Sequence, residues 1–253
     1  MSVIYEVVRG VAWATIDRAE ASNALNESVR SGLFDAAERF NADDTALVLV
    51  LTGAGDRAFC AGGDLKEMAE TTLQVPPPDF VPQFGRNIEV TKPTISAVNG
   101  VAYAGGFLLA MMCDLCVAAE HARFAITEAK VGRGVPWGVR LPWLLPPRVA
   151  MQLLLTGDPI DARRAYELGL VNEVVPTAEL RGTAQRLGET IAANAPLSVA
   201  AAKQMIRRDV WDARGTDAFD WAEHLWESVY RSKDAQEGPR AFRERRPPRW
   251  QGK

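Results

Sequence analysis

The chain has 253 residues, a formal net charge of −3, 47% hydrophobic residues and 24% charged residues. This composition is that of an ordinary globular protein and excludes a wholly disordered or fibrous chain. At this length a chain buries enough surface for one large domain without disulfides or metals. The charge is uneven, because residues 239–253 carry +5 and the first 238 residues carry −8. The basic tail indicates either contact with phosphates or a solvated end.

The cysteines and the first residues favour a cytoplasmic protein. Three cysteines are too few for a secreted disulfide scaffold, and the chain does not begin with a basic and then apolar leader. Cys113 and Cys116 form a single CxxC among apolar neighbours, which favours buried small side chains over a redox or zinc site. The longest uncharged stretch, 93–113, contains a proline and several glycines, so we expect no membrane segment.

In chain order, the apolar patterns predict strands that alternate with helices, which indicates an α/β fold with parallel pairing. Strands are expected in a hairpin over 3–17 and at 46–51, 94–98, 115–119, 123–126 and 171–175. Helices are expected at 26–40 with Asn26 as N-cap, at 84–90, after Gly105-Gly106, and at 148–155 and 162–168. The stretch 71–82 contains four prolines and predicts an irregular loop.

Beyond Pro196 the pattern predicts helices alone, at 197–213 and 216–232. The second of these presents a dense set of apolar and aromatic side chains. Such a helix at the end of a chain packs on the core or on another subunit.

Several common catalytic motifs are missing from the sequence. There is no GxxxxGK phosphate loop, no GxGxxG after the first strands, no GxSxG elbow and no HExxH helix. The chain has two histidines, far apart in sequence. This does not favour a histidine triad or a metal site with several histidines.

Two glycine-rich turns stand out, because each joins an apolar strand to a helix. The first contains Gly62-Gly63 and the second Gly105-Gly106. Each leaves backbone N–H groups unpaired at a helix start, where the helix dipole favours negative charge. Two such groups converging on one point would form an oxyanion hole. Each turn taken alone favours a tight bend, but the recurrence of the turn in two strand–helix units favours the functional interpretation.

Five segments that span almost the whole chain are similar, in order and spacing, to those of the enoyl-CoA hydratase/isomerase (crotonase) superfamily. They are 17–25 (DRAEASNAL), 58–66 (AFCAGGDLK), 99–106 (NGVAYAGG), 110–114 (AMMCD) and 238–245 (GPRAFRER).

The resemblance implies a crotonase-like core of ββα units wound into a spiral over 1–195, which binds acyl-CoA. It implies that 196–253 form a helical oligomerisation region with a basic tail, which makes a homotrimer or a hexamer. The implied partner is an acyl-CoA thioester, with coenzyme A entering as part of the substrate, no separate cofactor, no metal and no nucleic acid. The basic tail would then meet the phosphates of CoA.

The resemblance also implies roles for individual residues. The N–H groups of Gly63 and Gly105 would hold the thioester oxygen, where charge develops when a neighbouring proton is removed. The implied binding residues are Ala21, Ala61, Asp64 and Leu65 around the adenine and pantetheine, Lys66 near the phosphates, and Phe242 and Arg245 at the nucleotide of a neighbouring subunit. For Lys66 and Arg245, a solvated charge is an equal alternative.

The sequence departs from the hydratase pattern at one of two glutamates. Hydratases of the family have one shortly after the second glycine turn, where this chain has Leu108, and another that matches Glu128. Monofunctional isomerases look similar to this chain, because a single base can move a proton from C2 to C4. The resemblance therefore implies isomerisation first, with hydration by Glu128 alone or a non-catalytic acyl-CoA binder as alternatives.

Two candidate site residues have structural alternatives. Glu128 could instead be a surface carboxylate at a strand end. Trp137 follows where family members shape the acyl pocket, and its bulk suggests a restricted or flat acyl group, although it could equally be a core tryptophan.

Overall fold

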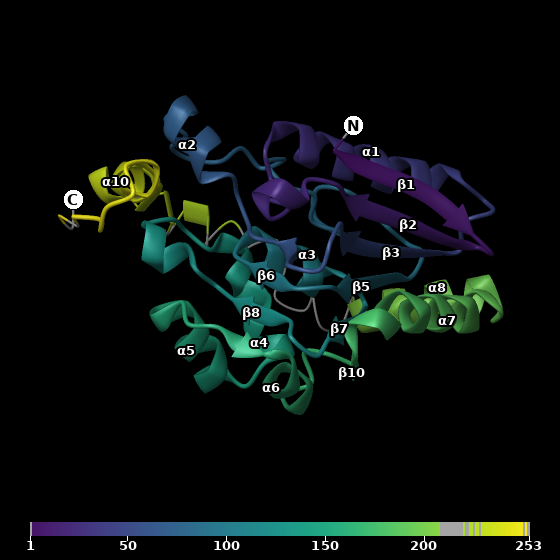
Figure 1. Ribbon diagram of the computed structural model, residues 1–253. Helices are drawn as coiled ribbons and strands as arrows, with labels where there is room; N and C mark the ends of the chain where they lie inside the picture. The colour runs from purple at the N-terminus through teal and green to yellow at the C-terminus, as the bar shows by residue number, and fades with distance from the viewer. Residues whose placement is uncertain are drawn as a thin grey trace.

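The computed structural model describes residues 2–207, 220, 223–224, 226–227, 229–249 and 251, and the elements follow one another as strand–strand–helix units (Figure 1). The strands are β1 (Val3–Val8), β2 (Val11–Ile16), β3 (Val48–Gly53), β4 (Ala58–Cys60), β5 (Thr94–Val98), β6 (Val101–Tyr103), β7 (Leu115–Ala119), β8 (Arg123–Ala125), β9 (Ile160–Asp161) and β10 (Glu173–Val175).

The α-helices are α1 (Glu27–Ala42), α2 (Leu65–Thr71), α3 (Gly105–Met112), α4 (Leu141–Leu144), α5 (Pro147–Thr156), α6 (Ala162–Glu167), α7 (Leu180–Ala192), α8 (Pro196–Arg207) and α10 (Lys233–Arg243). Four short 3-10 helices are η1 (Ala19–Ala21), η2 (Glu128–Val131), η3 (Pro136–Arg140) and η4 (Thr177–Glu179).

The first unit confirms the predicted hairpin and helix cap. Arg9 and Gly10 have φ values of 50° and 78°, so both central residues of the turn are left-handed, as a two-residue hairpin with twisted strands requires. The Asn26 side chain accepts a hydrogen bond from Val29 N at 3.0 Å, which satisfies one of the unpaired donors at the start of α1.

The strands form two sheets. The larger has the order β1-β2-β3-β5-β7-β10 and the smaller β4-β6-β8-β9. Pairing is parallel except for β1 with β2 and β8 with β9. In the units that start with β3, β5 and β7, the first strand joins the larger sheet and the next strand joins the smaller one. The chain therefore winds as a spiral of ββα units (Figure 1).

The larger sheet separates two apolar cores. Leu49 and Leu51 of β3 point into the main core with α1 and α3, whereas Val48 and Val50 join the second core under α7. Because successive side chains of a strand point to opposite faces, a continuous apolar run is what a strand covered on both faces requires.

The helix predicted at 84–90 is wrong. The structure has a tight turn there instead, with Gly85 at φ 75° and its N–H bonded to Ile88 O. The Asn87 side chain accepts from Gln83 N and donates to Pro78 O and Val81 O, which are carbonyls of the preceding loop. Glycine and asparagine favour such local turns over a helix interior.

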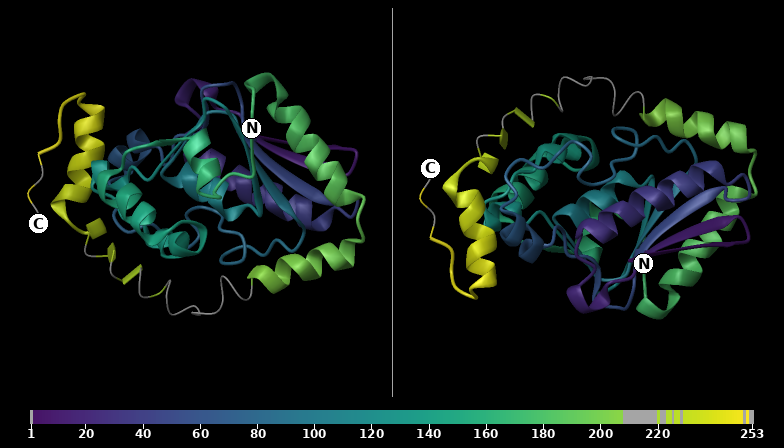
Figure 2. Two further views of the ribbon diagram at one scale, coloured as in Figure 1. Left: turned by 90° about the horizontal axis from the view of Figure 1, so that it is seen from below. Right: turned by 90° about the horizontal axis from the view of Figure 1, so that it is seen from above.

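The C-terminal part confirms the helical prediction as far as it is described. α8 ends at Arg207 among the described residues, so 208–213 of the first predicted helix lie outside them, as do eight residues of the predicted helix over 216–232. α10 packs on α2 and on η2, at the opposite end of the molecule from α7 and α8 (Figure 2). Across the described ranges, no helix has both the length and the apolar character needed to span a membrane.

Part of the basic tail is neutralised within α10 and the segment after it. The buried Glu237 carboxylate forms ion pairs with Arg240 and Arg246 and accepts from Arg249 N. These contacts hold the Glu237 pKa well below its ordinary value, chiefly through the Arg246 hydrogen bonds. They also fix the end of the chain against α10.

The glycine at position 106 lets α3 pack closely on β4. A Cβ added to Gly106 would lie 2.0 Å from Cys60 O, which is backbone and has no rotamer by which to move away. We expect Gly106→Ala to lower the free energy of unfolding by about 1–3 kcal/mol, the usual cost of overpacking. Urea unfolding at a fixed protein concentration measures this.

The matched control is Gly182→Ala in α7. Its added Cβ would meet no atom closer than 3.5 Å, and the position is exposed within a helix. This variant should gain about 0.4–1 kcal/mol, because alanine restricts the unfolded chain. Equal stability of the two variants would contradict the close approach at Gly106.

Candidate active site

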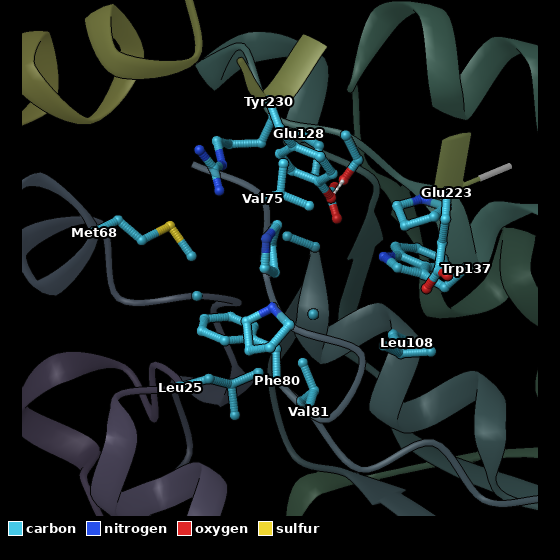
Figure 3. Close-up of a pocket in the computed structure, with 18 of the residues that line it drawn as sticks. Leu25, Met68, Val75, Phe80, Val81, Leu108, Glu128, Trp137, Glu223 and Tyr230 are labelled. Carbon is cyan, nitrogen blue, oxygen red and sulfur yellow. Dashed lines mark hydrogen bonds between the residues drawn. The ribbon is translucent and has the colours of Figure 1, made fainter. Parts of the chain in front are cut away.

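A cavity of about 480 Å³ is lined by both glycine turns and by Glu128. Figure 3 shows Glu128 among the side chains that line it. Its walls come from α2, α3, η2, η3, the proline-rich loop and the C-terminal region. The residues that line it include Leu25, Ala61, Gly63, Leu65, Met68, Val75, Phe80, Ala104, Gly105, Leu108, Glu128, Trp137 and Tyr230.

The two glycine turns touch each other because β4 pairs in parallel with β6. A Cβ built on Gly105 would lie 3.9 Å from Gly63 N. Within the described part of the chain, neither the Gly63 nor the Gly105 N–H donates a hydrogen bond to an acceptor. A Cβ added to Gly63 would lie 2.3 Å from Met68 Cε, so the flexible end of the Met68 side chain would have to shift to admit a side chain there. Both amides line the cavity as free donors.

Ala104, immediately before Gly105, has a strained backbone. Its φ of 50° and ψ of −120° belong to a region that residues with a Cβ rarely adopt. The Ala104 N–H donates to Ala125 O at 2.9 Å, which ties this turn to β8, the strand that precedes Glu128. Such strain is stored where a functional site requires it.

Glu128 begins η2, three residues after the end of β8, and its side chain is buried. It is 7% exposed, and within the described residues its Oε2 has no hydrogen-bond partner. Burial raises the pKa of Glu128 to about 8, against smaller lowering effects from its own backbone N–H and from Trp137. The alternative that Glu128 is a surface carboxylate is therefore wrong.

Leu108 and Trp137 make apolar walls beside this carboxylate. Leu108 lies one turn into α3 after Gly105 and is buried. Trp137 is also buried and stacks on Phe107, with ring centroids 6.0 Å apart and an interplanar angle of 25°. Trp137 therefore serves both the core and the cavity, so the two alternatives for it are compatible.

The proline-rich loop forms another wall. Val75, Phe80 and Val81 line the cavity together with three prolines (Figure 3). The Arg30 guanidinium lies 4.1 Å from the centroid of the Phe80 ring, which helps to hold the loop against α1.

A group of polar residues in the cavity was not predicted from the sequence. Glu223, His224, Glu227 and Tyr230 come from the C-terminal region, and Arg86 from the turn after the proline-rich loop forms an ion pair with Glu223. The two partners are 137 positions apart, so no local pattern could have indicated the pair.

The residues implied in CoA binding fall into two groups. Ala61 and Leu65 line the cavity next to Gly63, whereas Ala21, Asp64 and Lys66 lie outside the lining. Asp64 accepts from Lys66 N and Glu67 N as the N-cap of α2, and it forms an ion pair with Arg18 at 2.6 Å.

The charged and aromatic residues implied at the nucleotide are exposed. Lys66 lies in the first turn of α2, and Phe242, 55% exposed, lies in the last turn of α10. Arg245 follows α10 with a left-handed φ of 54°. Neither Phe242 nor Arg245 reaches the cavity of its own chain, and their contact with a nucleotide stays a prediction.

The fold and this site together define a crotonase-like α/β protein, with free backbone amides and one buried carboxylate around an apolar cavity. The model of the enoyl-CoA hydratase/isomerase family matches residues 6–253. The (E)-benzylidenesuccinyl-CoA hydratase of Thauera aromatica is 38% identical over 100% of both chains. The carnitinyl-CoA dehydratase of Salmonella agona (strain SL483) is 38% identical over 94% of both.

A solved structure gives the same result for the fold. The carnitinyl-CoA hydratase from Mycobacterium avium superposes with a TM-score of 0.88 at 37% identity, covering 100% of this chain and 99% of that chain. The chain therefore belongs to the enoyl-CoA hydratase/isomerase family, and the prediction of a crotonase-like fold is confirmed.

The buried state of Glu128 predicts how stability depends on pH. The Glu128 pKa is about 8 in the folded state against an ordinary value of 4.5, so the folded chain holds a proton that the unfolded chain releases between these values. Wild type should therefore lose stability relative to Glu128→Gln as pH rises through this window, by up to ~1.4 kcal/mol per pH unit. The stability difference between the two proteins should not change with pH outside this range.

Urea unfolding of both proteins at pH 5, 6.5 and 8 measures this difference. A constant difference across the three pH values would show that Glu128 has an ordinary pKa and is hydrated. The measurement does not depend on any catalytic activity.

Proposed function

We propose that this protein is an enoyl-CoA isomerase that moves a double bond from C3 to C2 through a thioester enolate. The observation that carries the proposal is a single buried carboxylate, Glu128, in an apolar cavity where Leu108 provides no second acid or base. Glu128 would take a proton from C2 of a 3-enoyl-CoA and return it at C4. The proton stays within the substrate, so this reaction needs no cofactor beyond the CoA that the substrate carries.

The N–H groups of Gly63 and Gly105 would stabilise the enolate oxygen. Both donors are unpaired within the described residues and line the cavity that Glu128 lines. Preorganised donors act most strongly where water is excluded, and losing one typically costs about 10²–10³ in rate. The strained Ala104 supports this role, because its backbone holds the second donor in place.

The raised pKa of Glu128 suits a proton shuttle. A pKa of about 8 makes Glu128 a stronger base than an ordinary carboxylate while leaving roughly a tenth of it ionised at pH 7. The neutral acid formed after the first step is then stable in the apolar cavity, and it can deliver its proton to C4.

A second candidate is hydration or dehydration of an acyl-CoA. The names of the relatives favour it, because they describe a benzylidenesuccinyl-CoA hydratase and carnitinyl-CoA dehydratases. Glu223 places a second carboxylate in the cavity wall, although this carboxylate forms an ion pair with Arg86. In this reaction Glu128 would deprotonate a water for attack at C3, and C2 would receive a proton.

Substrate tests separate these reactions. Wild type should convert 3-enoyl-CoA to 2-enoyl-CoA, with kcat/KM rising through pH of about 8 as Glu128 ionises. Glu128→Gln should lower this rate by about 10²–10⁴, the usual contribution of a general base. Hydration of 2-enoyl-CoA by wild type would favour the second candidate, and tight CoA binding without either reaction would favour a binding protein.

Leu108→Glu provides a gain-of-function test. It places a carboxylate on α3, one turn after Gly105, where family hydratases have their first glutamate. If the missing carboxylate limits hydration, the variant should hydrate 2-enoyl-CoA about 10²-fold faster than wild type. Leu108→Gln is the matched control, because it has the size and polarity of the new side chain without its basicity. Equal hydration by the two variants would contradict this reasoning.

We further propose that Lys66 and Arg245 bind the CoA phosphates, with Arg245 and Phe242 supplied by a neighbouring subunit of a homotrimer or hexamer. Both cations are exposed, so each contact is worth about 1 kcal/mol or less. Lys66→Ala and Arg245→Ala should therefore raise KM a few-fold, with kcat unchanged and with weaker dependence on salt. Arg148→Ala on α5 is the exposed control, and an equal rise in KM there would contradict the assignment.

A further inference from the structure

Arg133 is a buried cation that joins the catalytic turn to the proline-rich loop. It is 5% exposed, and in the described residues it has no ion pair with a carboxylate. Its Nη1 donates to Leu73 O and its Nη2 to Gln74 O, both at 2.9 Å. These carbonyls immediately precede Val75, the first loop residue that lines the cavity.

The backbone of Arg133 is fixed to Glu128. Arg133 N donates to Glu128 O at 2.9 Å, and Gly132 ends η2 with a left-handed φ of 66°. The main chain of Arg133 is therefore fixed to the turn that carries Glu128, and its guanidinium links the two loop carbonyls to that turn.

The C-terminal region covers the same arginine. The Arg133 guanidinium lies 4.8 Å from the centroid of the Tyr230 ring, and the Tyr230 hydroxyl donates to Gly134 O at 3.0 Å. Gln236 in α10 donates a further hydrogen bond to Leu73 O at 3.2 Å. The loop, the turn after Glu128 and the C-terminal region therefore meet at one side chain.

This arrangement is costly for folding, which suggests a function. A guanidinium taken out of water without a carboxylate partner loses hydration that two carbonyls and an aromatic face replace only in part. Burial accordingly lowers the pKa of Arg133, against a smaller raising effect of Tyr230. A neutral side chain of similar length would fill the space at a lower cost of desolvation.

We infer that Arg133 is a positioning residue that fastens the proline-rich loop and Tyr230 over Glu128, and so keeps water away from the carboxylate. The inference rests on the proposed function of Glu128 as the single base. The loop residues that line the cavity are Val75, Phe80 and Val81. Arg133 binds the two carbonyls at the start of this loop.

The direction of a pKa change distinguishes fastening from a direct charge effect. Removing a nearby cation would raise the Glu128 pKa, whereas admitting water to the cavity would lower it. The charged or titratable groups that share the cavity with Glu128 are Arg86, Arg133, Glu223, His224, Glu227 and Tyr230. Only Arg133 changes in the test, so the sign of the shift identifies its effect.

The first measurement is the pH profile of kcat/KM for 3-enoyl-CoA with wild type, Arg133→Met and Arg133→Lys. In Arg133→Met the midpoint should move down from about 8 by one unit or more, towards an ordinary carboxyl value, with the limiting rate roughly tenfold lower. Arg133→Lys keeps the cation but loses the two-nitrogen fork and the planar group over Tyr230, so it should restore the wild-type profile only in part. An unchanged or raised midpoint in Arg133→Met would overturn the inference.

The matched control is Arg163→Met, the same chemical change at an exposed arginine of α6 that pairs with Glu167. It should leave the midpoint unchanged. Hydrogen exchange of the backbone amides at 72–75 and 79–81 should be faster in Arg133→Met and unaltered in Arg163→Met. Equal protection of these amides in Arg133→Met and wild type would also overturn the inference.

A second comparison separates failure of this inference from failure of the proposed function. The pH dependence of stability, compared between proteins with Glu128 and with Gln at that position, reports the Glu128 pKa without substrate. Arg133→Met is then introduced into both wild type and Glu128→Gln. The pH range over which their stability difference changes should move to lower pH. If wild type turns over no 3-enoyl-CoA, the isomerase proposal fails, while this comparison and hydrogen exchange still decide the role of Arg133.

Gln236→Leu provides a milder variant in case Arg133→Met does not fold. It removes the other side-chain donor to Leu73 O and leaves the buried cation in place. The midpoint should shift in the same direction by a smaller amount, with faster exchange at 72–75. If Arg133→Met cannot be folded and Gln236→Leu behaves as wild type in both measurements, the inference is wrong.

Discussion

The burial of the Glu128 carboxyl group is the constraint on which the rest of the site depends. An ionised carboxylate with an oxygen that lacks a partner is unfavourable away from water, so the group holds its proton up to a pKa of about 8. Leu108 sustains this state because it can supply no counter-charge, whereas Trp137 opposes it by a smaller amount, since its side chain lowers the Glu128 pKa. The same burial that costs stability at high pH makes Glu128 a better base than a surface glutamate.

The two glycine turns that line the same cavity as Glu128 come together because of the repeated ββα unit. Each unit passes from the larger sheet to the smaller one and then enters a helix, so equivalent turns lie next to each other wherever the small-sheet strands pair. The pairing of β4 with β6 thereby brings the Gly63 and Gly105 turns into contact. Glycine at position 63 lets the Met68 side chain pack against this turn, because an added Cβ would force Met68 Cε to shift. The repeated unit thus brings the two turns into contact, and the glycines in them permit the close approach.

Several charged residues that the family resemblance implicates in binding also have structural partners. Asp64 caps α2 and pairs with Arg18, and this fixes the helix that begins beside Gly63. In the basic tail, Glu237 pairs with both Arg240 and Arg246, and its single negative charge offsets one of their two positive charges. The cations that remain exposed, among them Lys66 and Arg245, are those best suited to a soluble phosphate ligand.

The sequence by itself determined the features that depend on neighbouring residues. The Arg9-Gly10 hairpin, the Asn26 cap and the buried run of β3 follow from local backbone preference and from hydrophobic periodicity, and the motif pattern around the two glycine turns identified the family. Local reasoning failed at 84–90, because carbonyls of the preceding loop bind Asn87 and stabilise a turn. Only the tertiary structure decided that Glu128 is buried, that Arg86 meets Glu223 and that Arg133 holds the loop. Desolvation and contacts between distant residues arise when separate segments pack together, and no short stretch of sequence contains that information.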